Sequence, residues 1–214
     1  MNVVVFGATG AVGRRAVAEA LLRGHAVTAV ARSVERLGAL RGEMKRVALD
    51  LTEDALKAAA AMEGRDAAIS ALRPAPGDEA LLVPLTRTVL VAAAAAAVPI
   101  YVTGGAATLR LDRDGEDTVL SAPGFLPDAV RPIAEACARQ DALLDDHPGA
   151  KWTYFRPPAM LVDGARTGRY ALGRNALVKD DRGNSSISYA DFAVALLDLA
   201  ELRPRARMRL AVGW

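Results

Sequence analysis

Residues 2–13 read NVVVFGATGAVG, a strand-length apolar run that leads into three glycines and then into an alanine-rich segment of helical character. In this setting Gly7 permits a tight turn, Gly10 lets backbone N–H groups approach a pyrophosphate, and Gly13 lets the helix pack closely on the sheet. The helix N-terminus adds partial positive charge. The pattern predicts a dinucleotide-binding loop, and the alternative is a glycine-rich turn with no ligand. The residues assigned to this loop are Gly7, Thr9, Gly10, Ala11, Val12 and Gly13.

Further short runs rich in Val and Ile follow along the chain, separated by alanine-rich segments of helical length. Because these runs are apolar throughout, they predict parallel strands that are buried on both faces. The predicted fold is therefore α/β: a Rossmann-type, doubly wound, mostly parallel sheet with helices on both faces. The predicted strands are 2–8, 26–32, 45–51, 66–72, 99–104 and 152–157, and the predicted helices are about 11–23, 53–61, 83–97 and 131–146.

The C-terminal part of the chain predicts one more helix and one more strand. Ser188 precedes Asp191 by three residues, which predicts a capping-box-like start for a helix that runs to about residue 201. The run RMRLAVGW at 207–214 predicts a last strand that closes the sheet. No linker or repeat divides the sequence, so we expect a single domain over residues 1–214, with a small substrate-side portion at about 152–190.

The composition argues against several classes of partner. The 27 basic residues nearly balance the 25 acidic ones, and a net charge of +2 gives no case for binding nucleic acid or a membrane surface. Cys137 is the only cysteine, so no intramolecular disulfide is possible, and with only His25 and His147 no metal site is expected. We expect a cytoplasmic protein, a monomer or homodimer, whose partner is a small-molecule acceptor.

The second predicted strand ends in Arg32 and Ser33, where NAD-binding proteins carry an acidic residue for the ribose 2′-hydroxyl. No acidic residue follows until Glu35. A guanidinium here would attract the 2′-phosphate of NADPH through charge-assisted hydrogen bonds, whereas an acid would repel it. The sequence therefore predicts a preference for NADP(H) over NAD(H), with a solvated surface arginine as the alternative.

The carboxyl ends of the other predicted strands should meet at the same edge of the sheet and face the cofactor cleft. Asp50 could accept a hydrogen bond from adenine, or it could cap the helix that follows. For the other strand ends, ordinary packing is the alternative. The longest irregular segment, about 105–130, follows the fifth strand and should form the outer wall of the substrate site. The strand-end residues assigned to the cofactor are Asp50, Leu51, Ser70, Ala71, Leu72, Thr103 and Gly104.

Several motifs extend this pattern over nearly the whole chain. They are GATGAVG at 7–13, EALLRGHAVTAVAR at 19–32, DAAISAL at 66–72, TGGAATL at 103–109, ARTGRYALG at 165–173 and ISYADFAVALLDLAE at 187–201. With these motifs the sequence resembles the atypical short-chain dehydrogenase/reductase group, in particular the NAD(P)H-flavin reductase-like proteins related to biliverdin reductase B and the NmrA-like proteins. The resemblance implies a Rossmann fold, the use of NAD(P) and no metal.

Reductases of the wider superfamily often carry a Tyr-x-x-x-Lys pair that protonates a ketone, and this sequence lacks it. The tyrosines and the residues four positions later are Tyr101 and Gly105, Tyr154 and Pro158, Tyr170 and Arg174, and Tyr189 and Ala193. A flavin needs no such acid, because its ring system stabilises the added hydride and water protonates the product. The absence is therefore compatible with reduction of a flavin, as substrate rather than bound prosthetic group, or of a similarly conjugated acceptor.

The run YFRPPAM at 154–160 places Arg156 and Pro157 by the expected nicotinamide end of the cleft. Pro157 is assigned to the cofactor. Arg156 could bind a flavin phosphate or another anion, or it could form a salt bridge inside the fold. Thr103 and Arg156 are the candidate catalytic residues. We expect an NADPH-dependent reductase of a flavin or similar acceptor, and the alternative is an NmrA-like redox sensor that binds NADP(H) without turnover.

Overall fold

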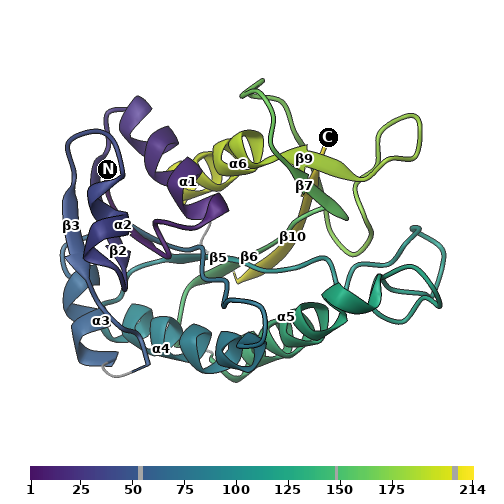
Figure 1. Cartoon of the computed structure of the whole chain (residues 1–214), viewed down its shortest axis with the longest axis horizontal. Coiled ribbons are helices and arrows are strands. Elements are labelled where there is room, and N and C mark those ends of the chain that lie inside the picture. The colour runs from purple at the N-terminus through teal and green to yellow at the C-terminus, as the bar shows by residue number, and fades with distance from the viewer. Residues whose placement is uncertain (53–54, 148, 204–206) are drawn as a thin grey trace.

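The computed structural model describes residues 1–52, 55–147, 149–203 and 207–214, and eight strands form its main sheet. These strands are β1 (Asn2–Phe6), β2 (Ala26–Ala31), β3 (Lys45–Ala48), β4 (Ala67–Ser70), β5 (Ile100–Thr103), β6 (Trp152–Arg156), β8 (Ala171–Gly173) and β10 (Met208–Gly213). Their order in the sheet is β3-β2-β1-β4-β5-β6-β10-β8 (Figure 1). All neighbouring strands are parallel except β10 and β8. The crossover between β3 and β4 makes the β1–β4 junction the point where the winding reverses.

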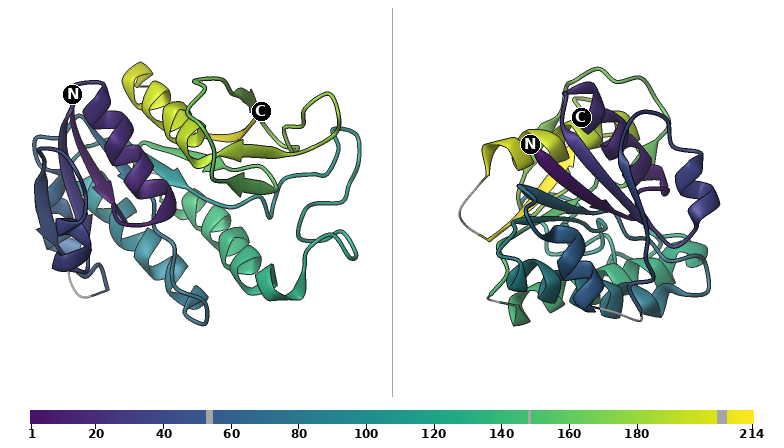
Figure 2. Two further views of the ribbon diagram at one scale, coloured as in Figure 1. Left: turned by 45° about the horizontal axis from the view of Figure 1, so that its top comes forward. Right: turned by 90° about the vertical axis from the view of Figure 1, so that its left-hand side faces the viewer.

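Helices cover both faces of this sheet (Figures 1 and 2). One layer contains α1 (Ala11–Leu22), α2 (Val34–Gly38) and α6 (Tyr189–Leu202), and the other contains α3 (Ala55–Met62), α4 (Leu82–Ala95) and α5 (Arg131–Leu143). Among the described helices, none combines the length and the apolar character that crossing a bilayer requires.

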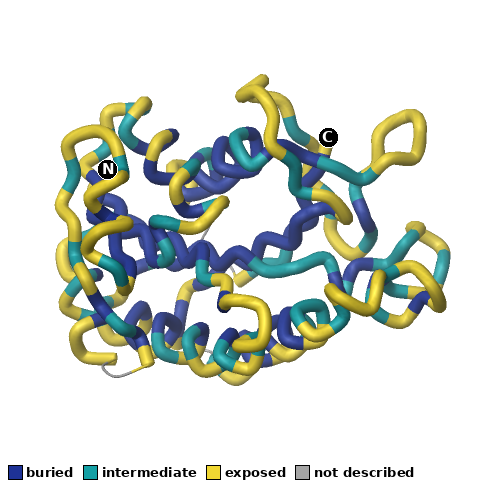
Figure 3. The backbone as a smooth tube through the Cα atoms, viewed as in Figure 1, coloured by how far each residue is buried: buried dark blue, intermediate teal, exposed yellow. Residues whose placement is uncertain are grey.

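The central strand β1 shows why the sheet must be covered by helices on both faces. Val3 and Val5 pack in the core shared with α1 and α6, whereas Val4 and Phe6 pack in the core shared with α3 and α4. All four residues are fully buried, and the strands in the middle of the fold are mostly dark blue in Figure 3. The predicted doubly wound α/β fold is thus confirmed, and its physical cause is the continuous apolar character of the strands.

The predicted elements agree with the structure to within a few residues at their ends. The predicted start of the helix that corresponds to α3, at residue 53, lies outside the described residues. At the start of α6 the Ser188 hydroxyl accepts the Asp191 backbone N–H at 2.9 Å, as the capping pattern predicts. The last strand, however, does not close the sheet, because β8 pairs antiparallel with β10 and forms the edge.

Among the described α-helices and strands, four short elements were not predicted. They are α2, β8 and the parallel pair β7 (Met160–Val162) and β9 (Ser186–Ser188), which forms a separate small sheet. Each of the three strands has three residues and α2 has five, so none is long enough to show a periodic apolar pattern.

A buried carboxylate fastens α5 to the distal part of the sheet. Oδ1 of Asp141 lies 2.5 Å from Nε of Arg209 on β10, and Oδ2 lies 4.0 Å from Nη1 of Arg156 on β6. The Thr108 hydroxyl donates to Oδ2 at 2.6 Å. Two arginines therefore share one buried carboxylate, and removing its charge would leave both without this counterion.

We expect Asp141→Asn to lower the free energy of unfolding by about 3 kcal/mol or more, because it breaks a buried ion pair on one side only. The control is Asp112→Asn, since the exposed Asp112 carboxylate lies 2.6 Å from the Lys179 ammonium. That change should cost at most about 1 kcal/mol. Urea unfolding measures both values, and equal small losses would contradict the structural role of Asp141.

Candidate cofactor and acceptor site

A cavity of about 1420 Å³ runs along the carboxyl edge of the sheet. It is lined by residues that follow each of the strands β1 to β6, and by Tyr189 and Phe192 at the start of α6. In open parallel sheets ligands bind at this edge, in the crevice where the winding reverses. The predicted strand-end residues are therefore brought together in one place, with the exceptions of Ser70 and Arg156 described below.

Each of the three glycines of the loop after β1 occupies its position for a different structural reason. Gly7 has φ +73°, and a Cβ there would lie 2.5 Å from the Ala71 carbonyl oxygen. A Cβ at Gly13 would lie 2.1 Å from the Gly7 carbonyl oxygen. At Gly10, by contrast, the nearest protein atom to a Cβ would be 3.4 Å away, and the residue lines the cavity. The fold thus requires glycine at 7 and 13, whereas at 10 glycine keeps the cavity open.

The start of α1 fits a dinucleotide pyrophosphate. Thr9, Gly10, Ala11 and Val12 line the cavity, whereas Gly13 does not and acts only through packing. In the described residues no side chain caps α1, and its first turn holds no acidic residue. The first N–H groups of a helix have no acceptor within the helix. They are therefore available to an anion in the cavity, which the helix dipole also favours.

Arg32 and Ser33 line the cavity beyond β2, together with Arg36, which sequence analysis missed. The Ser33 hydroxyl accepts the Arg36 backbone N–H at 3.1 Å and so starts α2. The side chains of Arg32 and Arg36 are exposed and have no ion-pair partner among the described residues. Arg36 could have been identified in the sequence from its position four residues after Arg32.

Asp50 and Leu51 line the same end of the cavity. The Asp50 Oδ1 atom accepts the Thr52 backbone N–H at 2.9 Å and the Thr52 hydroxyl at 2.7 Å. These bonds from Thr52 lower the pKa of Asp50, and the positive charge of Arg32 adds to the effect. Asp50 thus closes the turn after β3, and no hydrogen bond from the described residues reaches its second carboxylate oxygen.

Ala71, Leu72, Thr103 and Gly104 line the cavity as predicted, but Ser70 does not. The Ser70 side chain is fully buried and its hydroxyl has no partner in the structure, while its carbonyl oxygen accepts the Thr103 hydroxyl at 3.0 Å. Successive side chains along a strand point to opposite faces. Ser70 therefore points into the fold, and the next residue, Ala71, lines the cleft.

The prediction that Arg156 faces the cleft is wrong, and the alternative of a salt bridge inside the fold is what the structure shows. Arg156 is 3% exposed, faces Asp141, and donates from Nη2 to the Arg174 carbonyl oxygen. It is not among the residues lining the cavity, whereas Pro157 is. Arg156 is therefore part of the core and not a candidate for binding an acceptor.

The far end of the cavity is mostly apolar, although Arg73, Asp78 and Gln140 also belong to the cavity lining. The segment 105–130 forms its outer wall as predicted, and α5 and the residues after β6 add further apolar surface. Burial raises the pKa of the Cys137 thiol there to about 11, so the thiol is neutral at ordinary pH. The main residues of this wall are Ala107, Val119, Phe125, Ile133, Met160 and Phe192.

Of the four tyrosines, all within the described residues, Tyr189 alone lines the cavity. Burial raises the pKa of Tyr101 to about 12. Burial and a 2.7 Å hydrogen bond to Asp198 do the same for Tyr170. The buried Tyr154 donates to Gln140 at 2.9 Å. No lysine is among the described residues that line the cavity, so the Tyr-Lys arrangement of ketone reductases is absent in space as well as in sequence.

Comparison with known proteins identifies the family. Residues 7–201 match a family described as NAD(P)H-binding. The chain is 31% identical to the protein YwnB of Bacillus subtilis over 204 residues, which are 94% of this chain and 92% of YwnB. The chain belongs to this NAD(P)H-binding family, and the resemblance seen in the motifs is confirmed.

Two solved structures cover the chain completely. One, described as a candidate NADH-flavin reductase from Streptococcus pneumoniae, has a TM-score of 0.89 at 30% identity, with 99% of its own chain covered. The other, described as a candidate exported protein from Burkholderia pseudomallei, has a TM-score of 0.86 at 33% identity over its whole chain.

We expect Gly10→Val to abolish NADPH binding in a protein that still folds, because its side chain would enter the cavity rather than the fold. Gly13→Ala is the contrasting change, since its Cβ would strike the Gly7 carbonyl oxygen, and it should lower the unfolding temperature. NADPH fluorescence titration and thermal melting measure the two effects. Retained NADPH affinity in folded Gly10→Val would refute the assignment of the loop.

Proposed function

We propose that this member of the NAD(P)H-binding family is an NADPH-dependent reductase that passes a hydride to a flavin or a similarly conjugated acceptor. The observation that supports the proposal most directly is the distribution of charged and apolar residues along the cavity. Arg32 and Arg36 line one end, and an uncapped helix start lies between the two ends. The other end is mostly apolar, although Arg73 also lines the cavity, and the described lining residues include no tyrosine–lysine pair. The relative from Streptococcus pneumoniae, described as a candidate NADH-flavin reductase, supports the reaction class.

The preference for NADPH rests on Arg32 and Arg36. Both guanidinium groups line the cavity beyond β2, where a ribose 2′-phosphate would lie. Glu35 lines the cavity too, but it accepts the Ser33 hydroxyl at 3.1 Å. Asp50 at the same end likewise accepts hydrogen bonds from its neighbour Thr52. Both carboxylates are thus already engaged by neighbouring groups, whereas the two guanidinium groups can form charge-assisted hydrogen bonds that favour a phosphate over a hydroxyl at this place.

The cofactor, when bound, supplies a hydride from its nicotinamide ring. The chain contributes positioning: the loop after β1 holds the pyrophosphate, Thr103 and Gly104 border the ring, and the wall 105–130 excludes water from the acceptor. The Thr103 hydroxyl already donates its hydrogen to the Ser70 carbonyl oxygen, so this group can accept a hydrogen bond from a ligand but is not placed to donate a proton to it. Reduction of a flavin then takes one hydride from NADPH and one proton from water.

The missing proton donor also suits a second function, an NADP(H)-binding redox sensor of the NmrA-like type. The mostly apolar wall formed by segment 105–130 favours turnover, because a sensor needs no site for an acceptor. We also propose a cytoplasmic location, where reduced dinucleotide is available, a small molecule as sole partner apart from a second copy, and no nucleic acid or membrane. A protein that binds NADPH but oxidises it with no flavin or quinone would be the sensor.

Loss of one arginine tests the cofactor preference. Arg32→Ala and Arg36→Ala should each weaken NADPH binding about tenfold or more, the value of a charge-assisted hydrogen bond of about 1.5–3 kcal/mol, and leave NADH binding unchanged. Arg41→Ala is the matched control, because Arg41 is exposed but does not line the cavity. Binding titrations with both dinucleotides measure this, and equal losses for NADPH and NADH would refute the assignment.

The single tyrosine in the cavity tests the reaction. Tyr189→Phe should leave flavin reduction within a few-fold of the parent, since a general acid is typically worth ~10²–10⁴ in rate. Simple ketones should be poor substrates for both proteins. A hundredfold loss of flavin reduction in a folded Tyr189→Phe protein would show that Tyr189 is a proton donor, and the proposed direct transfer would fail.

A further inference from the structure

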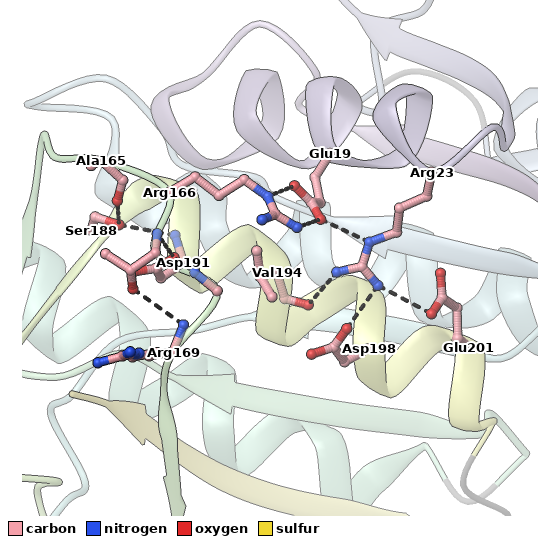
Figure 4. A network of polar contacts seen from close by, with 12 residues as sticks. Glu19, Arg23, Ala165, Arg166, Arg169, Ser188, Asp191, Val194, Asp198 and Glu201 are labelled. Carbon is pink, nitrogen blue, oxygen red and sulfur yellow. Dashed lines mark hydrogen bonds and ion pairs between the residues drawn. The ribbon is translucent and has the colours of Figure 1, made fainter.

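The segment 163–170, which we call the strap, joins β7 to β8 and lies across α1 and α6 (Figure 4). It contains most of the motif ARTGRYALG, and α6 contains most of ISYADFAVALLDLAE. Apart from Tyr189, the polar residues of these two motifs do not line the cavity. The structure shows instead that they bind one another, which gives both motifs a common role.

Asp191, in the first turn of α6, holds the middle of the strap. Its Oδ1 accepts the backbone N–H groups of Thr167 and Gly168, each at 2.8 Å. Its Oδ2 accepts the Thr167 hydroxyl at 2.6 Å and the indole N–H of Trp214 at 3.0 Å. Asp191 is fully buried. Burial opposes its charge, but the hydrogen bonds from Thr167, Gly168 and Trp214 outweigh burial and lower the pKa of Asp191.

Glu19 of α1 holds the strap from the other side. Its carboxylate forms a two-pronged pair with Arg166, with Nε–Oε2 at 2.7 Å and Nη2–Oε1 at 2.8 Å. Arg23 donates to the same Oε1 at 2.8 Å and reaches Asp198 of α6 at 2.7 Å. The hydrogen bond from Arg166 is the main reason that the pKa of Glu19 is lowered. The strap, α1 and α6 are therefore joined by one continuous polar network.

The middle of the strap makes few further contacts with the rest of the fold. Residues 163–169 are all exposed, so apolar burial contributes little to their position. The Ser188 hydroxyl adds a hydrogen bond to the Ala165 carbonyl oxygen at 3.1 Å. At the ends of the strap, Asp163 pairs with Arg15 at 3.5 Å, and Tyr170 donates to Asp198 at 2.7 Å and packs against the core. Between these ends, the position of residues 164–169 depends mainly on hydrogen bonds to the two buried carboxylates.

The strap is continuous with the acceptor end of the cavity. Residues 157–161, just before it, line the cavity, and Asp191 lies between two further lining residues, Tyr189 and Phe192. A strap released from Asp191 would free the C-terminal end of the wall 157–161. Among the described residues, the contacts that would remain include the connection to β6, the Ala159 N–H bond to the Ser185 hydroxyl at 3.3 Å and the short pairing of β7 with β9.

We infer that Asp191, supported by the Glu19–Arg166 pair, is a positioning residue for the acceptor: it holds the strap so that residues 157–161 close the acceptor end beside Tyr189 and Phe192. The inference rests on the proposed function. It predicts a separation of effects, because the dinucleotide loop and Arg32 lie outside this network. Weakening the network should impair acceptor binding and leave NADPH binding intact.

The test compares two arginines of the strap. Arg166→Ala removes the pair with Glu19, which keeps Arg23 as a partner, so the protein should fold. Arg169→Ala removes the same charge, but the Arg169 side chain has no partner among the described residues. Riboflavin affinity of the NADP⁺-bound protein, by fluorescence quenching, should fall about fivefold or more in Arg166→Ala, the low end of coupling between linked sites. NADPH affinity should not change, and Arg169→Ala should match the parent.

Asp191→Asn should show the same separation more strongly, and hydrogen exchange over residues 157–170 should rise in it and in Arg166→Ala but not in Arg169→Ala. Unchanged riboflavin affinity in Arg166→Ala, or an equal loss of NADPH affinity, would overturn the inference while the proposed function stands. A parent protein that neither binds nor reduces a flavin contradicts the proposed function, and the inference falls with it.

Discussion

Helix α1 can begin directly beside the end of β1 only because residue 13 carries no side chain. A Cβ at Gly13 would lie 2.1 Å from the Gly7 carbonyl oxygen, so any other residue would push the helix away from the loop. The close approach puts the first turn of α1 at the carboxyl edge of the sheet, with its N–H groups toward the cavity. The same helix carries Glu19, which pairs with Arg166. One packing contact therefore fixes the dinucleotide loop and the anchor of the acceptor wall on a single rigid element.

The chemical character of the cavity lining changes along its length. Arg32 and Arg36 bring positive charge to one end, while the other end has apolar walls and a neutral thiol at Cys137. An electrostatic preference at one end and water exclusion at the other suit the transfer of a hydride, which needs a well-placed donor and acceptor more than it needs an acid. This division explains how a fold shared with ketone reductases can lack their tyrosine and lysine.

The sequence predicted the sheet and most of the site because both follow from topology. Buried parallel strands are apolar throughout, and their carboxyl ends must meet at one edge, which placed Arg32, Thr103 and Pro157 correctly at the cavity. Topology does not decide which way a strand-end side chain points. Arg156 turns inward because Asp141 and the Arg174 carbonyl oxygen lie there, and no local pattern reveals partners so distant in sequence. The strap network was hidden for the same reason, although its motifs were visible.

The central claim is that the cavity passes a hydride from NADPH to a flavin without a proton donor from the protein. The most direct measurement is anaerobic single-turnover reduction of riboflavin by the protein with NADPH that carries deuterium at the transferred position. We predict that the protein bleaches the flavin absorbance faster than NADPH alone does, and that deuterium slows this step. A protein that binds NADPH yet leaves the rate of flavin reduction at the level seen without protein would contradict the claim.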